Sequence, residues 1–181
     1  MKLRYQIYGF LLICLCWALP AWSAPDQPEE AQVKSAIILN MARYIDWPAE
    51  SFNSDGAPMS FCYAGQGTLS ASLPLLQGKT VKGHPVVVRR MSSSSDIAGC
   101  HVVILDATER RNVATIVDRT RRLPILTVGD ISGFSRDGGI VEFFLQTGKV
   151  RFDINLSAAR HSRLKISSQL LKVARIVRSD D

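Results

Sequence analysis

The sequence lacks the short motifs that mark common hydrolases and nucleotide-binding enzymes. It contains no Gly-x-Ser-x-Gly elbow, no His-Glu-x-x-His pair and no phosphate-binding loop with its lysine. Histidine is scarce, and His84, His101 and His161 lie in three dissimilar sequence contexts. The Gly65-Gln66-Gly67 segment has no third glycine at the spacing of a dinucleotide site. We therefore expect no enzymatic activity and no bound cofactor.

Charge of one sign is not concentrated in any part of the chain. The 22 basic residues outnumber the 16 acidic ones, but they form no dense stripe with interleaved aromatic residues. Proteins that bind nucleic acid usually carry such a stripe. Nucleic acid is therefore not an expected partner.

The first 23 residues have the features of a secretory signal peptide. Lys2 and Arg4 form a basic start, residues 7–19 form an apolar block, and small residues precede a cleavage position after Ser23. The alternative is a retained membrane anchor, but the apolar block is shorter than the roughly 20 residues that span a bilayer. We predict export, no membrane insertion after processing, a flexible leader at residues 24–30, and one domain at residues 31–178.

Cysteine is also rare, which excludes a structural zinc site. Cys14 and Cys16 fall in the signal segment, so the mature chain keeps only Cys62 and Cys100. Two isolated cysteines are too few for a structural zinc ion, and no other ligands stand at metal spacing, so no metal is expected. In an oxidising compartment the two favour a disulfide. The alternative is a pair of buried free thiols that behave as small apolar side chains.

The mature chain begins with a predicted helix. From Glu29, apolar residues recur at helical spacing at Val33, Ile37, Met41 and Tyr44. The helix should end near Trp47, because a residue that precedes proline is disfavoured in the α conformation. Tyr44 and Trp47 are interpreted either as a lid on the core or as an aromatic patch that binds a partner.

Strands and helices then alternate along the chain. We predict strands at residues 59–64, 85–90, 100–105 and 125–128, and helices at residues 68–76 and 108–120. Buried strands that alternate with helices imply a parallel sheet covered on both faces. The predicted fold is therefore a single α/β domain with a mixed, mainly parallel sheet, helices on both faces, and a C-terminal antiparallel hairpin followed by helices.

The predicted hairpin carries the candidate recognition residues. A Thr147-Gly148 turn joins residues 140–145 to residues 149–155, and apolar and charged side chains alternate in the second strand. Arg151 and Asp153 would then lie on a wet face, either as surface charges or as a recognition pattern at a sheet edge. Such an edge can accept a partner strand or pair with a second copy of the chain. Asp130 and Asp137 lie in glycine-rich turns, where turn formation explains them better than a catalytic carboxylate pair.

The ordered set of these segments resembles the YfiR family. The resemblance covers residues 33–177 and rests on the segments 34–37, 43–48, 125–130, 138–140, 150–155 and 164–171, together with the positions of Cys62 and Cys100. It implies a periplasmic regulator that inhibits an inner-membrane diguanylate cyclase by binding the periplasmic sensor domain of that enzyme. It also implies that the redox state of the cysteines tunes the regulator. The chain departs from some relatives in having no second cysteine pair in its mature part.

The same sequence also allows a second association and an alternative function. A homodimer through the hairpin edge is a second expected association. The alternative function is a periplasmic module that binds a small ligand and reports to another receptor. Its ligand would occupy a crevice at the carboxyl ends of the strands, near residues 65–67 or Asp106.

Overall fold

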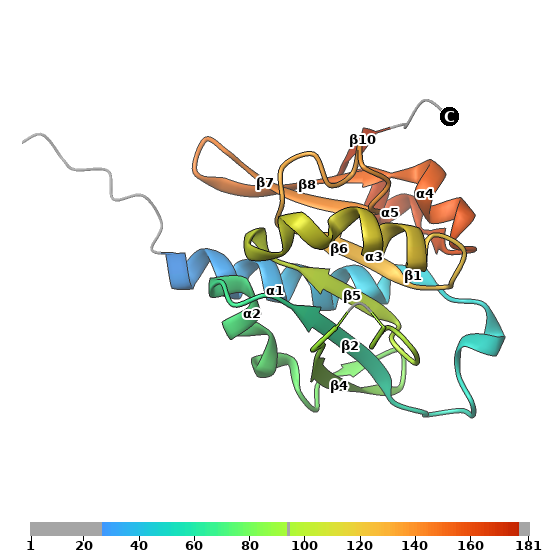
Figure 1. The fold of residues 1–181 in the computed structure, drawn as a ribbon. Helices are drawn as coiled ribbons and strands as arrows, with labels where there is room; N and C mark the ends of the chain where they lie inside the picture. Colours follow the sequence, from blue (N-terminus) through green and yellow to red (C-terminus); the bar gives the residue numbers. More distant parts are fainter. Residues whose placement is uncertain (1–26, 94, 178–181) are drawn as a thin grey trace, which may run out of the picture.

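The computed structural model describes residues 27–93 and 95–177, and they form one α/β domain (Figure 1). The predicted signal peptide at residues 1–23 lies outside the described residues, as do residues 24–26 of the predicted leader and Arg178. Within the described part, no helix has the length and apolar character required to cross a bilayer.

An eight-stranded sheet runs through the middle of the domain in the order β10-β8-β7-β6-β5-β2-β4-β3. Its five central strands, β7, β6, β5, β2 and β4, are parallel, whereas β7 and β8 form the antiparallel hairpin. The strands are β2 (Met59–Ala64), β3 (Thr80–Val81), β4 (His84–Arg90), β5 (Val102–Leu105), β6 (Leu126–Gly129), β7 (Val141–Gln146), β8 (Lys149–Asn155) and β10 (Arg175–Val177). The predicted mainly parallel sheet with a C-terminal hairpin is confirmed.

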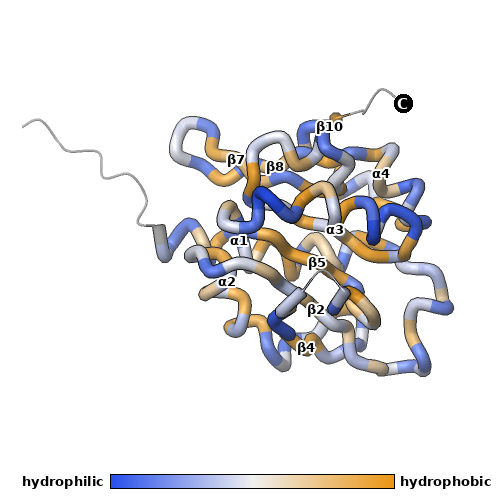
Figure 2. Tube along the Cα trace, viewed as in Figure 1, coloured by the Kyte–Doolittle hydropathy of each residue, from blue (hydrophilic) through white to orange (hydrophobic). Residues whose placement is uncertain are grey.

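Helices cover both faces of this sheet (Figure 1). One face packs against α1 (Gln27–Arg43), α2 (Thr68–Ser72), the 3-10 helix Leu73–Leu76, α4 (Leu156–His161) and α5 (Ser168–Leu171). The other face packs against α3 (Val113–Thr120), which follows the 3-10 helix Ala107–Asn112. The strands β2 and β5 supply alternate side chains to the two cores, as Phe61 and Cys62 do in β2. The inner strand β5 is accordingly apolar throughout, and hydrophilic residues gather on the outer helices and loops (Figure 2).

The first helix differs from its prediction in both its start and its orientation. Residues 27–30, expected in the flexible leader, form its first turn. The face that meets the core contains Ile38, Met41 and Ala42, whereas Val33 is exposed. Lys34 lies outside the predicted apolar stripe of this helix, yet it is only 5% exposed.

A tertiary ion pair explains the orientation of the helix. The Lys34 ammonium lies 2.7 Å from the carboxylate of Asp130, at the end of β6, and 2.5 Å from that of Glu30. A buried charge is tolerated when it is paired in this way. Because Asp130 is 96 residues away in sequence, helical periodicity alone does not reveal the contact.

The C-terminal segment is a second difference. The spacing of Leu170, Leu171, Ala174 and Val177 predicts a last helix that continues to Val177, with Ser167 as its cap and Arg175 on its outer face. Ser167 caps α5 as expected, by accepting a hydrogen bond from the Leu170 amide. The helix nevertheless ends at Leu171, and Arg175–Val177 form β10, which pairs in parallel with β8. The prediction of a long final helix is therefore wrong.

Candidate interaction surface

The β7–β8 hairpin projects beyond the rest of the sheet. Its two strands pair over their full length, from Val141–Ile154 to Gln146–Lys149. The turn residues Thr147 and Gly148 both have positive φ, 49° and 71°, as a two-residue type I′ turn requires. On its other side β7 pairs with β6 only through Val141 and Glu142. The outer half of the hairpin therefore extends past the carboxyl end of β6 (Figure 1).

Half of the outer edge of β8 has no neighbouring strand among the described residues. The short β10 pairs with Asp153, Ile154 and Asn155. No strand of the described chain pairs with residues 149–152 on that side. The predicted half-open hairpin edge is thus present, but only over the projecting part of β8.

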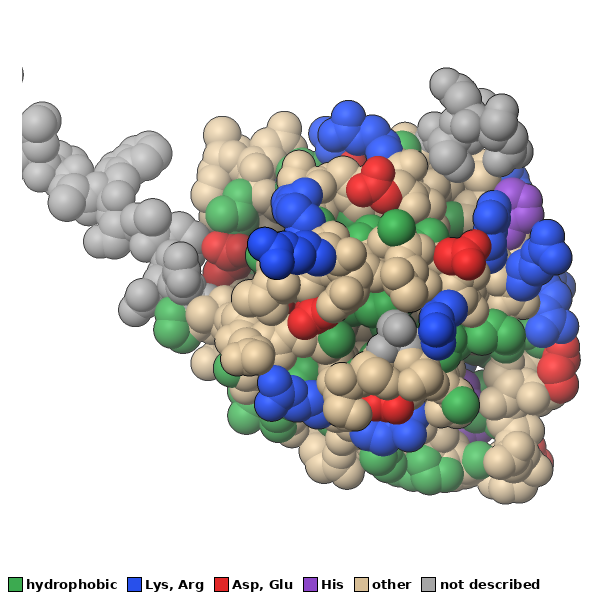
Figure 3. Space-filling model, in the orientation of Figure 1, with side chains coloured by type: hydrophobic (Ala, Val, Ile, Leu, Met, Phe, Trp, Pro, Cys, Tyr) green, Lys and Arg blue, Asp and Glu red, His purple; other side chains and the backbone are tan. Residues whose placement is uncertain are grey.

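An aromatic ring lies beside two arginines on one face of this projecting part. Arg151 is directly opposite Phe144 in the antiparallel ladder. The Arg175 guanidinium lies 4.3 Å from the centre of the Phe144 ring, in a cation–π contact. Lys149 and Arg151 are exposed. Over the face of the molecule that Figure 3 draws, Lys and Arg side chains are interspersed with acidic ones.

Asp153 does not lie on a wet face, so this part of the prediction is wrong. It is only 3% exposed, and its two carboxylate oxygens accept hydrogen bonds of 2.6 and 2.7 Å from Arg175. The alternation of residues along β8 does not predict this burial, because it is β10 that covers Asp153 from the edge of the sheet. Asp153 is consequently engaged inside the domain rather than offered to a partner.

The neighbouring carboxylate is also used internally. Glu142 accepts hydrogen bonds from the Gly133 and Ser135 amides and from the Ser135 hydroxyl. Burial alone would raise the pKa of Glu142, but these hydrogen bonds outweigh it and lower the pKa. With both carboxylates buried, the exposed charges that the described part of the chain places at this edge are the cations Lys149, Arg151 and Arg175.

The opposite face of the hairpin is apolar. Leu145 and Val150 pair across the ladder, and Ile176 of β10 is aligned with Ile154 on the same face. Leu145 is 50% exposed and Ile176 is 39% exposed. The projecting edge therefore has a cationic face and an apolar face.

Tyr44 and Trp47 lie at the other end of α1, away from the hairpin tip (Figure 1). Tyr44 is 43% exposed and lines a surface hollow of about 320 Å³ together with Lys82 and Gln169. Trp47 is half-buried and packs against the core, as expected for a lid. The structure does not bring these aromatic residues together with Arg151.

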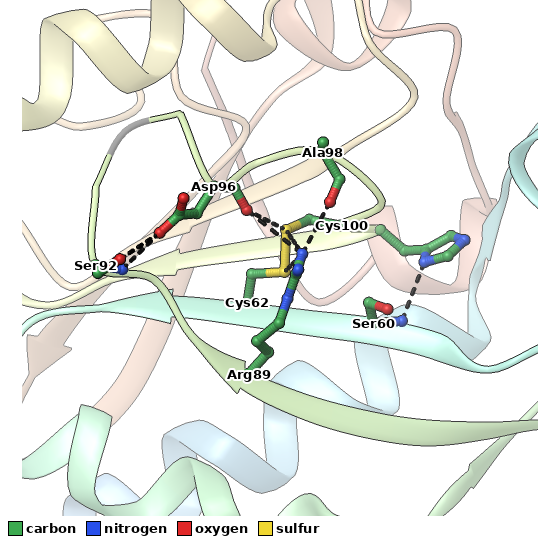
Figure 4. Close-up of a disulfide and its surroundings, with 8 residues drawn as sticks. Ser60, Cys62, Arg89, Ser92, Asp96, Ala98 and Cys100 are labelled. Atoms are coloured by element: carbon green, nitrogen blue, oxygen red, sulfur yellow. Dashed lines mark hydrogen bonds between the residues drawn. A yellow bond between two sulfur atoms is a disulfide. The ribbon is translucent and has the colours of Figure 1, made fainter.

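Cys62 and Cys100 form a disulfide that joins β2 to the start of β5 (Figure 4). Both cysteines are buried. The Arg89 guanidinium lies 3.5 and 3.3 Å from the two sulfur atoms and donates a 2.8 Å hydrogen bond to the Ala98 carbonyl. The bridge therefore fixes the polar loop between β4 and β5 to the sheet.

The carboxyl ends of β2 and β5 form the topological switch point of the sheet, where doubly wound folds commonly bind ligands. Here the Asp106 carboxylate fills that position. It accepts hydrogen bonds from the Gly67 amide, the Ser70 hydroxyl and the amide and hydroxyl of Thr108. Burial alone would raise the pKa of Asp106, but these bonds outweigh it and lower the pKa. The donors that would hold an anionic ligand are already occupied.

Sequence patterns did not predict four members of this surface, namely Phe144, Leu145, Lys149 and Arg175. Phe144 and Leu145 read simply as strand residues, and Arg175 was placed on the outer face of a helix. The alternation of residues 149–155 marked Lys149 as exposed, so that residue could have been found. No local signal places Arg175 beside Phe144, because the contact depends on the tertiary pairing of β10 with β8.

The sequence profile of the family described as YfiR/HmsC-like matches residues 31–175. No curated protein matches the chain significantly. Among solved structures, the chain is similar to the ABC domain from Streptococcus pneumonia in complex with L-Trp, with a TM-score of 0.52, 11% identity and coverage of 82% of this chain and 60% of that one.

It is also similar to a conserved domain protein from Vibrio cholerae O1 biovar El Tor, with a TM-score of 0.55, 12% identity and coverage of 83% of this chain and 60% of that one. The chain thus spans 60% of the length of both solved structures. At these identities the likeness concerns the fold alone.

Proposed function

The chain belongs to the YfiR/HmsC-like family, and on that premise we propose that it binds the periplasmic sensor domain of an inner-membrane diguanylate cyclase and inhibits the enzyme. The family is regulatory rather than catalytic, and its members are periplasmic. In this proposal the chain itself converts no substrate. It lowers the output of cyclic-di-GMP, and with it biofilm formation, by occupying the sensor domain.

The observation that carries this proposal is the projecting half of the β7–β8 hairpin. A monomeric domain usually pairs, shortens or covers its exposed strand edges, because an open edge invites another chain. Here β10 covers residues 153–155 and leaves residues 149–152 open. Exposed Arg151 and Lys149 lie on one face of the opening, and half-exposed Leu145 lies on the other. A surface with both an apolar face and a charged rim is suited to a protein partner.

Capture from membranes tests the proposal directly. The tagged mature chain is incubated with detergent-solubilised inner membranes, and the captured proteins are identified by mass spectrometry. We expect a diguanylate cyclase with a periplasmic domain, and we expect Arg151→Glu to reduce its capture. The matched control is Arg122→Glu, which reverses an exposed charge in the turn after α3.

A cellular measurement provides the functional readout. Deletion of the gene should raise cyclic-di-GMP, and expression of the wild-type chain should restore the original level. The Arg151→Glu chain should restore it less well at equal abundance in the periplasm. Unchanged cyclic-di-GMP on deletion, together with no cyclase captured by the wild-type chain, would show that the proposed function is wrong.

The small-ligand alternative has less support. Its expected crevice lies at residues 65–67 and Asp106, where the Asp106 carboxylate takes the backbone and hydroxyl donors. A surface hollow of about 240 Å³ remains beside Tyr63, Gln66 and Arg90. A thermal-shift screen against metabolites separates the two functions, because a ligand that binds only the folded state raises the melting temperature.

A further inference from the structure

The open edge of β8 presents backbone groups at defined residues. In a two-residue hairpin the residues that flank the turn, Gln146 and Lys149, form a hydrogen-bonded pair, and such pairs alternate along an antiparallel ladder. Arg151 therefore also directs its backbone groups toward β7. Val150 directs both of its backbone groups to the other side, where the described chain places no strand opposite it. Phe152 points to the same side, but the parallel pairing of Arg175 with Asp153 engages its carbonyl, so that only its amide is open.

Among the described residues, the exposed charges beside this edge all have one sign. Exposed Lys149 and Arg151 come from β8, and Arg175 comes from the edge strand β10. The nearby carboxylates are buried, Asp153 in its pair with Arg175 and Glu142 among the donors of residues 133–135. An added strand would meet these cations on one face.

The other face of the added strand would meet apolar side chains. Val150 is half-buried, and Leu145 and Ile176 are exposed on the same side of the sheet. Successive side chains of a strand point to opposite faces. A segment that complements both faces must therefore alternate between acidic and apolar residues.

We infer that the partner docks an extended segment of alternating acidic and apolar residues onto the open edge of β8, at residues 149–152, as an additional strand. Backbone hydrogen bonds to both groups of Val150 and to the Phe152 amide would supply much of the affinity. The acidic side chains would engage Arg151, Lys149 and Arg175, and the apolar ones would pack on Leu145 and Ile176. This mode of recognition is β-augmentation. The inference rests on the proposed function, because it describes the part of the sensor domain that the chain grips.

A second copy of this chain fits the same edge poorly. Two β8 edges that pair about a twofold axis place residues of the same face opposite each other. Lys149 would then face Arg151 of the other copy, or Arg151 would face its own counterpart. Like charges directly opposite each other destabilise a strand pair. Charge complementarity therefore favours an acidic partner over a homodimer through this edge.

Peptide binding tests the inference with a defined probe. A fluorescein-labelled peptide of eight residues that alternates glutamate and valine is titrated with the full mature chain, and fluorescence anisotropy is followed. The comparison peptide alternates lysine and valine. We expect only the glutamate peptide to bind, and we expect its affinity to fall as salt is raised from about 0.05 to 0.5 M, since salt screens exposed charges.

Variants distinguish strand addition from simple charge attraction. Val150→Pro removes the edge amide at a position where proline is tolerated, because that amide faces away from β7. We expect Val150→Pro and Arg151→Glu each to weaken peptide binding about tenfold or more. Val150→Thr keeps the amide, and Arg122→Glu reverses a distant charge, so both should bind like the wild type. Circular dichroism and urea unfolding verify that each variant is folded.

Any one of four results would overturn the inference. The lysine peptide could bind as tightly as the glutamate peptide, or folded Val150→Pro could bind the glutamate peptide unchanged. Sedimentation could also show a dimer that Val150→Pro abolishes, which would assign the edge to a second copy. If Val150→Pro and Arg151→Glu still capture the cyclase, the strand inference fails while the proposed function stands. If the wild-type chain captures no cyclase, the proposed function fails whatever the peptide does.

Discussion

Arg175 holds the carboxylate of Asp153 through two guanidinium nitrogens, at 2.6 and 2.7 Å, and so fastens β10 to β8. The carboxylate is buried, whereas the arginine side chain is 64% exposed and also covers the ring of Phe144. This pair decides how much of the β8 edge is closed. It closes residues 153–155, and no strand of the described part of the chain pairs with residues 149–152 on that side.

Replacement of Asp153 by asparagine should loosen β10. Removal of one partner from a buried ion pair costs about 3–5 kcal/mol, but solvent screens the largely exposed Arg175. We therefore expect a loss of about 1–2 kcal/mol in the free energy of unfolding, measured by urea denaturation. Hydrogen exchange at residues 175–177 should accelerate. Arg151→Gln, on the same strand, serves as the control and should change stability by about 0.5 kcal/mol or less. Equal losses in the free energy of unfolding for Asp153→Asn and Arg151→Gln would contradict the conclusion that the Arg175–Asp153 pair fastens β10.

The disulfide should contribute a large share of the stability of the domain. Cys62 and Cys100 are 38 residues apart in sequence, and closure of a loop of that size corresponds to about 4 kcal/mol in the chain-entropy model. We expect the double substitution Cys62→Ala/Cys100→Ala to lower the free energy of unfolding by up to about 4 kcal/mol.

Chemical labelling tests the same bridge without mutation. Because both cysteines are buried, native unreduced protein should resist alkylation, and its mass should be two hydrogens below that of the reduced protein. Alkylation of both thiols in unreduced, denatured protein would refute the disulfide. Labelling only after reduction and denaturation is the expected outcome.

The sequence predicted the parts of the fold that local pattern controls. Continuous apolar runs identified β2, β4, β5 and β6, and the Thr147-Gly148 turn identified the hairpin. The failures lie where distant residues decide the outcome. Lys34 is buried because Asp130 lies opposite it, and residues 175–177 form a strand because Asp153 and its neighbours on β8 pair with them.

The residues of the candidate surface likewise divide into those that a local pattern predicts and those that distant contacts determine. Arg151 was found because alternation in a strand marks exposed positions. Asp153 satisfied the same alternation and is nevertheless buried, because an edge strand added from the C-terminal segment covers it. Phe144 and Arg175 have no shared local signal, so their contact emerges only from the arrangement of β7, β8 and β10.

Gly65 is the glycine whose replacement should be least tolerated at the switch point. Its φ is +121°, and an added Cβ would lie 2.2 Å from the Asp106 carboxylate. Gly56 also has positive φ, +74°, but an added Cβ there meets nothing within 4 Å. Gly56→Ala therefore reports the backbone cost alone, about 1–2 kcal/mol. Gly65→Ala should cost at least about 2 kcal/mol more in urea unfolding, because it disrupts the hydrogen bonds of Asp106.

A double substitution tests the cause of that difference. If the clash with Asp106 is responsible, Gly65→Ala should cost less in an Asp106→Ala background than in the wild type, as a non-additive cycle. Strict additivity of the two substitutions would show that the clash is not the cause. The cycle also remains informative if Gly65→Ala alone is too unstable to measure, since the double variant then folds better than the single one.

Three stacked rings fasten the loop between α1 and β2. The ring of Phe52 lies between the imidazoles of His84 and His101, with centroid distances of 3.9 and 4.5 Å. His101 Nδ1 accepts a hydrogen bond from the Ser60 amide, so the ring proton is on Nε2, which donates to the Ser51 carbonyl. Burial lowers the pKa of His101 below its usual 6.5, and the neighbouring His84 lowers it further, against the opposing effect of the bond to Ser51. Protonation of Nδ1 would break the bond from Ser60.

Acidification should therefore destabilise the domain through His101. A histidine whose pKa is lower in the folded state binds a proton more readily when unfolded, so its contribution is present above about pH 6.5 and is lost as the pH falls through the folded pKa. The slope is at most about 1.4 kcal/mol per pH unit. Asp106 and Glu142, whose usual pKa values are 3.8 and 4.5, act at lower pH.

Urea unfolding between about pH 7 and pH 5 tests this prediction. The free energy of unfolding should decline less steeply with falling pH for His101→Gln than for the wild type. The control His161→Gln, exposed on α4, should keep the wild-type slope. Identical slopes for the wild type and His101→Gln would assign the pH response to another group.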